Sequence, residues 1–169
     1  SVPGEVVFVQ CAGSRDENHL PYCSAVCCSA SLKHALTIRE KLPDCKVKIF
    51  YIDLRVSGRN EDFLNKVKQE KNIELIKGKV GKVELNHENN KLVVEAEDIQ
   101  NGIKLKHETD MVVLATGIEP HNLPLDINTN SWGFLANGQE KGLVAVSCSK
   151  KPMDVSSSVK DATAAALKA

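Results

Sequence analysis

The residues best suited to redox or metal chemistry in this sequence are closely spaced cysteines. Four of the six cysteines fall within 18 residues in the pattern C-x11-C-x3-C-C, at Cys11, Cys23, Cys27 and Cys28. Four thiolates can hold a cubane iron–sulfur cluster, and soft sulfur ligands select iron–sulfur, zinc or copper(I) over hard cations. Cys23 and Cys27 would share one face of a helix that began early. We interpret the four cysteines primarily as iron–sulfur ligands.

Two other chemistries stay open on the residues alone. A structural zinc site usually shows paired knuckles with two to four residues between the cysteines, which the adjacent Cys27 and Cys28 match poorly. A redox-active disulfide usually uses C-x2-C, and this spacing is absent from the sequence. Cys45 and Cys148 stand apart from the group, and we interpret Cys45, in a turn after Pro43, as incidental.

The cysteines lie where a predicted strand gives way to a predicted helix. The apolar, β-branched run in residues 5–10 predicts a buried parallel strand, and residues 24–42 predict an amphipathic helix that stops at Pro43. Residues 47–53 predict a second strand, which gives a Rossmann-like strand, helix, strand unit. A helix that starts beside the cysteines would stabilise an anionic cluster with its positive dipole end.

The rest of the chain continues this unit and then changes character. Short alternating segments separated by asparagine and glycine predict an antiparallel meander, and a region rich in Asn, Gly and Pro at 120–142 predicts a hinge. The further predicted elements are a helix at 60–71, strands at 73–76, 79–85, 91–96, 103–107, 111–115 and 143–146, and a helix at 155–168.

The glycine-rich phosphate loop of dinucleotide-binding units is missing. The turn after the first strand offers only Gly13 of the three glycines in G-x-G-x-x-G, so usual nicotinamide binding is not expected. Asp53 would suit a ribose-binding carboxylate, but it is more commonly a strand-end cap. No G-x-G-x-x-G occurs anywhere in the chain, so a complete flavin motif is also absent.

Composition excludes other classes of function. The 22 basic residues balance 22 acidic ones and aromatic residues make up 4%, which argues against nucleic-acid binding. No apolar run approaches the roughly 20 residues that span a bilayer, so we expect no membrane insertion. The opening Ser-Val-Pro-Gly lacks the features of a signal peptide, which predicts a cytoplasmic protein. The five histidines are scattered and form no metal-binding pair.

Several segments together resemble one family, the A subunits of heterodisulfide reductase, with the related flavin subunits of the quinone-interacting membrane-bound oxidoreductase complex. The resemblance covers nearly the whole chain, and its cysteine motif is specific. It rests on Gln10-Cys11-Ala-Gly-Ser-Arg15, Tyr22-Cys23-Ser-Ala-Val-Cys27-Cys28, Leu32-Lys33-His34-Ala35, Tyr51-Ile-Asp-Leu-Arg55, Asp110-Met-Val-Val-Leu-Ala-Thr-Gly117 and Pro152-Met-Asp-Val-Ser-Ser-Ser158.

The resemblance implies an α/β fold with two parts. Residues 1–120 would form a Rossmann-like, thioredoxin-reductase-type, NAD(P)-binding-like domain with an antiparallel β-meander and the cysteine motif. Residues 121–169 would form a hinge and the C-terminal segment of an FAD domain. The family's cluster ligands carry over to Cys11, Cys23, Cys27 and Cys28. Its flavin-contacting positions carry over to Thr116, Gly117, Cys148, Pro152, Asp154 and Val155.

One departure concerns the flavin site. A Gly-Asp pair usual in the reductases reads Ser147-Cys148 here, so the expected carboxylate contact to the ribityl chain is not assured. Asp154 also suits a helix cap, which is the structural alternative to a flavin contact.

The functional expectation is an electron-transfer module. A 4Fe–4S cluster would relay electrons between FAD and partner subunits of an electron-transfer complex. The expected location is the cytoplasm, with a membrane-bound complex as a peripheral partner in the alternative. The chain is expected to be a C-terminal fragment of a larger oxidoreductase, inactive alone and weak in FAD binding, and we nominate no catalytic residue. The alternatives are an NAD(P)H-dependent flavoprotein disulfide reductase domain and a zinc-stabilised, non-enzymatic scaffold domain.

Overall fold

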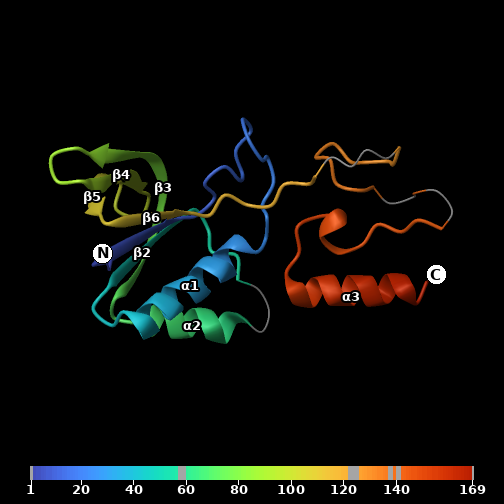
Figure 1. Cartoon of the computed structure of the whole chain (residues 1–169), viewed down its shortest axis with the longest axis horizontal. Helices are drawn as coiled ribbons and strands as arrows, with labels where there is room; N and C mark the ends of the chain where they lie inside the picture. Colours follow the sequence, from blue (N-terminus) through green and yellow to red (C-terminus); the bar gives the residue numbers. More distant parts are fainter. Residues whose placement is uncertain (1, 57–59, 122–125, 137–138, 140–141, 169) are drawn as a thin grey trace. The chain divides into compact units, whose positions relative to one another are not determined.

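The chain folds into two compact units. A computed structural model describes residues 2–56, 60–121, 126–136, 139 and 142–168 (Figure 1). The first unit comprises Ser1–Gly13 and Cys27–Thr116, and the second comprises Ser14–Val26 and Gly117–Ala169. The segment between Cys11 and Cys27 therefore belongs mainly to the second unit. The assignment of 1–120 and 121–169 to nicotinamide-type and flavin-type domains stays a prediction.

The first unit is built on a six-stranded mixed sheet in the order β5-β4-β3-β2-β1-β6. Strands β6, β1, β2 and the first part of β3 run parallel, and β3, β4 and β5 form the antiparallel meander. The elements are β1 (Glu5–Val9), α1 (Cys27–Lys41), β2 (Lys46–Tyr51), α2 (Glu61–Gln69), β3 (Ile73–Asn86), β4 (Lys91–Asp98), β5 (Ile103–Thr109) and β6 (Met111–Leu114).

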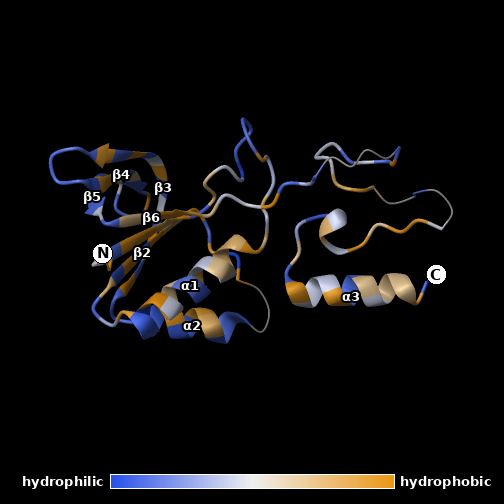
Figure 2. Cartoon of the chain, viewed as in Figure 1, coloured by the Kyte–Doolittle hydropathy of each residue, from blue (hydrophilic) through white to orange (hydrophobic). Residues whose placement is uncertain are grey.

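Strand β1 contributes to two separate hydrophobic cores. Val6 and Phe8 pack with buried residues of α1, α2 and β2 on one face of the sheet, whereas Val7 and Val9 pack with residues of β3 and β4 on the other. Because successive side chains in a strand point to opposite faces, a strand buried on both faces reads as a continuous apolar run. In Figure 2 the hydrophobic colour is concentrated on the parallel strands, whereas β5 is largely hydrophilic.

Strand β3 corrects one sequence expectation. Residues 73–76 and 79–85 are not two strands, because β3 is continuous from Ile73 to Asn86. Its first part pairs with β2, its second part pairs with β4, and the β4 register shifts between Val80 and Lys82. A Cβ at Gly78 would overlap the carbonyl oxygen of Glu97, so this glycine permits close backbone approach rather than a turn.

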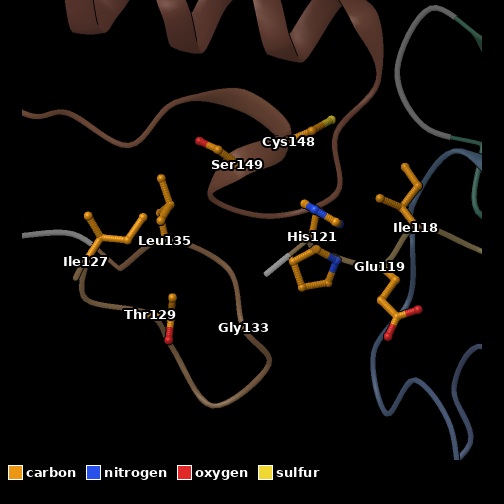
Figure 3. Close-up of a pocket in the computed structure, with 10 residues that line it drawn as sticks. Ile118, Glu119, His121, Ile127, Thr129, Gly133, Leu135, Cys148 and Ser149 are labelled. Carbon is orange, nitrogen blue, oxygen red and sulfur yellow. The ribbon is translucent and has the colours of Figure 1, made fainter. Parts of the chain in front are cut away.

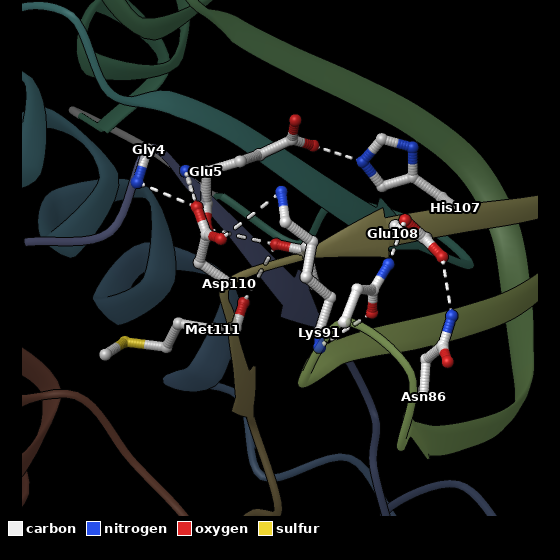
Figure 4. A network of polar contacts seen from close by, with 10 residues as sticks. Gly4, Glu5, Asn86, Lys91, His107, Glu108, Asp110 and Met111 are labelled. Carbon is white, nitrogen blue, oxygen red and sulfur yellow. Dashed lines mark hydrogen bonds and ion pairs between the residues drawn. The ribbon is translucent and has the colours of Figure 1, made fainter. Parts of the chain in front are cut away.

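The amino end of β1 is held by a polar network (Figure 4). The Asp110 carboxylate accepts hydrogen bonds from the backbone N–H groups of Gly4 at 2.8 Å and Glu5 at 3.0 Å. Thr109 Oγ1 donates to the Glu5 carbonyl at 3.0 Å, and the His107 ring contacts the Glu5 carboxylate. The network joins the end of the meander to the first strand.

Asp110 should make stability depend on pH. The two backbone donors hold the pKa of its carboxyl below the usual value, the larger contribution coming from Glu5. A lowered folded pKa contributes stability above the unfolded pKa of about 3.9, and this is lost as pH falls through the folded value. Asp110→Asn should therefore melt at a lower temperature than wild type at pH 7, by circular dichroism. If the difference in melting temperature between wild type and Asp110→Asn did not become smaller below about pH 4, the role given to Asp110 would be contradicted.

The second unit has little regular structure among its described residues. It contains a short 3-10 helix, η2 (Ser147–Ser149), and one α-helix, α3 (Val155–Ala166), which confirms the predicted C-terminal helix. The predicted strand at 143–146 is wrong, because these residues form no strand and pair with no described strand. Within the described part of the chain, no helix has both the length and the apolar character needed to cross a bilayer.

Candidate functional site

Cys11 occupies a tight turn at the carboxyl end of β1. Its φ of 56° lies in the left-handed region, which non-glycine residues rarely adopt. Hydrogen bonds fix the backbone on either side, from Gln10 N to the Phe50 carbonyl at 3.0 Å and from Ala12 N to the Ala115 carbonyl at 3.1 Å. The thiol is thus placed at the edge of the sheet where ligands of open α/β folds bind.

Cys27 and Cys28 are the first two residues of α1. Cys28 is buried on the same side of α1 as Leu32, and its Sγ lies 3.9 Å from the carbonyl oxygen of Asp53, which follows β2. Cys27 is partly exposed. Of the motif cysteines in the first unit, Cys11 therefore follows β1, and Cys27 and Cys28 begin α1, with Cys28 in contact with the backbone after β2.

Cys23 does not share a helical face with Cys27, so that expectation is wrong. The helix begins only at Cys27, and Ala25 before it has a φ of 61°, which stops a helix from extending back to Cys23. Cys23 lies in the second unit, where its Sγ accepts a hydrogen bond from Ala25 N at 3.4 Å. No sequence signal marks Ala25 for a left-handed conformation.

The loop that carries Cys23 is anchored within the second unit. Backbone hydrogen bonds close it, with Arg15 N donating to the Tyr22 carbonyl and Asp16 N to the Leu20 carbonyl, each at 3.1 Å. Ser24 Oγ accepts a hydrogen bond from Ile118 N at 2.8 Å and lies 3.4 Å from Ser14 Oγ. These contacts join the loop to the turn around Gly117.

Tyr22 makes several of the contacts that hold this loop in place. It is buried, its hydroxyl donates to the Ile118 carbonyl at 3.0 Å, and its ring packs against Trp132 and Phe134 with centroids 5.3 Å away in each case. Burial, and to a smaller extent Glu119, raise the pKa of the hydroxyl. Sequence reasoning assigned Tyr22 and Ser24 no role, although both lie in the motif that carries the family resemblance.

Gly117 can only be glycine in this arrangement. Its φ is 115°, and a Cβ there would overlap Ser14 Oγ and lie 2.5 Å from Ser24 Oγ. Thr116, the preceding residue, ends the first unit. The predicted flavin-contacting turn is therefore a constrained backbone position packed by the Cys23 loop.

The second predicted flavin segment surrounds the start of α3. Cys148 lies exposed on η2, with its Sγ 3.5 Å from the Met153 carbonyl oxygen. Ser147 N donates to the carboxylate of Asp161 in α3 at 2.7 Å, and Lys150 pairs with the same carboxylate. Pro152 is partly buried in the link to the helix. This turn is thereby fixed against α3.

Asp154 serves as the N-cap of α3. Its carboxylate accepts hydrogen bonds from Ser157 N at 2.9 Å and Ser157 Oγ at 2.7 Å, and the backbone donor in particular lowers its pKa. Val155, the first helical residue, is strongly exposed. The alternative of a helix cap is therefore confirmed for Asp154, and its contact with a flavin stays a prediction.

One cavity within the second unit is lined by Cys148 and by residues that follow the predicted flavin turn at Gly117 (Figure 3). It has a volume of about 520 Å³. Residues 118–121 line it on one side, and Cys148 and Ser149 line it on the other, with further contributions from Ile127, Thr129, Gly133 and Leu135. Gly117, Pro152, Asp154 and Val155 flank these walls in sequence but do not line the cavity within the described part of the chain.

Relatives with known names share the sequence over nearly its whole length. The chain is 36% identical over 97% of its length to a protein of Archaeoglobus profundus that is named as similar to the A subunit of heterodisulfide reductase. It is 33% identical over 99% of its length to the second iron-sulfur A subunit of CoB–CoM heterodisulfide reductase from Methanopyrus kandleri. The chain belongs to the heterodisulfide reductase A family. It spans about a quarter of the length of these two relatives, 25% and 28% respectively.

Solved structures confirm the predicted fold class of this heterodisulfide reductase A homologue. Thioredoxin reductase from Lactococcus lactis, in its FR conformation, matches 97% of the chain with a TM-score of 0.65 at 15% identity. The thioredoxin reductase of T. acidophilum matches 96% with the same score at 16% identity. The chain covers 51% and 50% of these proteins. A search against protein-family models found no match.

The residues of the heterodisulfide reductase A motif fit the chemistry of an iron–sulfur cluster. Cys11 follows β1, and Cys27 and Cys28 form the N-terminus of α1. Gln10, the residue before Cys11, has a buried amide without a partner within the described residues. No three His, Cys, Asp or Glu side chains of the described residues are arranged to hold a metal ion. The four-cysteine ligand set therefore stays a prediction.

Cys45 lies apart from this motif. It is buried in the core that α1 covers, and desolvation raises the pKa of its thiol. A raised pKa keeps a thiol protonated and unreactive, which agrees with its interpretation as incidental to the chemistry.

Proposed function

We propose that this chain is the cluster-carrying segment of a flavin and iron–sulfur oxidoreductase. Cys11, Cys23, Cys27 and Cys28 would bind a 4Fe–4S cluster that relays electrons between FAD and partner subunits. The observation that carries the proposal is the placement of Cys11 just after β1 and of Cys27 and Cys28 at the start of α1, with Cys28 in contact with the carbonyl of Asp53 after β2. In thioredoxin-reductase-type folds this edge of the sheet is where a cofactor is expected.

The surrounding backbone suits a negatively charged group. The first N–H groups of a helix have no intrahelical partner and carry the positive end of its dipole, and α1 begins with two of the proposed ligands. When bound, the cluster would accept and donate single electrons. The protein would hold it with thiolates, orient it through the fixed turn at Cys11, and limit its exposure to water through the burial of Cys28.

The names of relatives support the same assignment. The Methanopyrus kandleri relative is named an iron-sulfur protein, and the Methanothermobacter thermautotrophicus relative is named as the A subunit of an H2:CoB–CoM heterodisulfide,ferredoxin reductase. We therefore propose other subunits of an electron-transfer complex as partners and the cytoplasm as the location. The substrates of those enzymes are not assigned to this chain.

We further propose that the second unit contributes part of an FAD site. Thr116 and Gly117 would approach the flavin, and Cys148, Pro152, Asp154 and Val155 would lie along its ribityl and phosphate region. The cavity between 118–121 and Cys148 supports this arrangement. Because the chain has no G-x-G-x-x-G sequence, it should bind FAD weakly when studied alone.

Iron and sulfide analysis tests the cluster assignment. After anaerobic reconstitution, the wild-type chain should contain about four irons and about four acid-labile sulfides, and dithionite should produce an EPR signal from a reduced cluster. A folded chain that took up stoichiometric zinc and no iron would contradict the proposal and support a zinc-stabilised scaffold. Saturable NADPH binding by the iron-free chain would instead support a disulfide reductase.

A further inference from the structure

Gln10 is a buried polar residue without a partner in the described part of the chain. Its side chain is 6% exposed, and neither Nε2 nor Oε1 has a hydrogen-bond partner there. Only its backbone is bonded, through N–H to the Phe50 carbonyl at 3.0 Å. Most buried amides in folded proteins are hydrogen-bonded, because an unsatisfied donor loses its interaction with water and gains nothing in return.

The amide lies on the side of the sheet that α1 covers. Val6 and Phe8 face the core formed with α1, and alternation along the strand places Gln10 on the same face, one residue before Cys11. Gln10 is bonded to Phe50 of β2, and the residue that Cys28 contacts, Asp53, follows the end of β2. Gln10 thus lies at the carboxyl end of β1 beside Cys11, and its backbone is bonded to the strand that precedes the Cys28 contact.

A leucine or methionine would be the ordinary choice at such a position. An apolar side chain of similar size would extend the core of Val6, Phe8 and Leu32 without burying an unsatisfied donor and acceptor. Buried polar groups that lower stability tend to be found where a ligand or a reaction requires them. A ligand rich in hydrogen-bond acceptors would satisfy the Nε2–H group.

We propose that Gln10 is a positioning residue for the proposed iron–sulfur cluster, donating an Nε2–H···S hydrogen bond to a cluster sulfide or to a ligating thiolate. This inference rests on the proposed function. A hydrogen bond to cluster sulfur stabilises the more negative, reduced form, so it raises the midpoint potential. Reduction adds one electron to the cluster and breaks no bond, and the amide keeps its proton throughout.

The test compares wild type with Gln10→Met in the full chain, with Gln100→Met as a control because Gln100 is exposed in the β4–β5 turn. Both variants should retain about four irons. Gln10→Met should show a lower midpoint potential in an EPR-monitored titration and should lose an exchangeable-proton coupling in pulsed EPR of the reduced cluster. Gln100→Met should match wild type in both measurements.

Thermal unfolding of the iron-free chain provides a readout that separates this role from a structural one. Without the cluster, Gln10→Met should melt at the same temperature as wild type or higher, because it removes an unsatisfied buried amide. If Gln10 were instead hydrogen-bonded within the protein, iron-free Gln10→Met should melt at a lower temperature than iron-free wild type. A lower melting temperature with an unchanged potential would overturn the inference.

Failure of the inference and failure of the proposed function give different results. If both proteins bind the cluster and Gln10→Met has the same midpoint potential and the same proton coupling as wild type, only the role of Gln10 is overturned. A wild-type chain that takes up no iron overturns the proposed function, and the role of Gln10 with it.

Discussion

Replacing Cys27 with serine is expected to remove most of the iron that the wild-type chain takes up on anaerobic reconstitution. Cys27 begins α1 and is partly exposed, so the change should leave the folded chain intact. A serine hydroxyl is a harder and far less acidic ligand than a thiol, and three remaining thiolates hold a cubane cluster poorly. Iron per chain should fall from about four to well below that value, and the EPR signal of the reduced cluster should weaken or change shape.

Cys148→Ser is the matched control for this experiment. It makes the same chemical change at an exposed thiol outside the four-cysteine motif, so the iron content should equal that of wild type. Equal iron in Cys27→Ser and wild type would remove Cys27 from the ligand set. Equal loss in both variants would show that the iron was bound nonspecifically to thiols.

Gly117→Ala is expected to destabilise the second unit strongly. The backbone at Gly117 has a φ of 115°, and an added Cβ would overlap Ser14 Oγ and lie 2.5 Å from Ser24 Oγ. Strain at such a backbone position costs about 1–3 kcal/mol, and displacement of the two serines would add to it. The serine contacts hold the loop of Cys23, so the loss should extend to that loop.

Trp132 offers a local measurement of this effect. It is the single tryptophan of the chain, and its ring packs against Tyr22 in the second unit. The urea midpoint followed by its fluorescence should fall in Gly117→Ala. Gly142→Ala is the control, because Gly142 also has a positive φ, of 95°, but a Cβ there meets no atom of the described residues within 4 Å. Similar losses in both variants would mean that backbone strain, and not contact with the serines, explains the result.

The parts of the fold that follow local periodicity could be predicted from sequence. The apolar run at Val6 to Val9 and the apolar side of α2 each carry a strong signal, and the apolar residues of α1 and β4 carry a weaker one. The continuity of β3 was missed because Gly78 resembles a turn residue, whereas its role depends on Glu97 in the neighbouring strand. The predicted strand at 143–146 failed because apolar composition does not supply a pairing partner.

The type of chemistry at the candidate site could be predicted from sequence, but the contacts that hold its loops in place could not. The cysteine spacing identified the thiols, but the left-handed backbone of Ala25, which separates Cys23 from α1, has no sequence signature. Tyr22 and Ser24 contact Ile118 across 96 and 94 residues of sequence, a separation that local patterns cannot reveal. The burial of Gln10 without a partner likewise depends on the assembled fold.

The late position of residues 111–118 in the chain has a consequence for folding. Strand β6 supplies the second neighbour of β1, and Ile118 supplies the bonds to Tyr22 and Ser24, so one short stretch completes both units. During synthesis from the amino terminus, β1 therefore remains an open edge until Leu114 has emerged. Contacts so distant in sequence slow folding, because a long loop must close before either unit is complete. The segment between Cys11 and Cys27 is consequently made well before the residues that fix it in place.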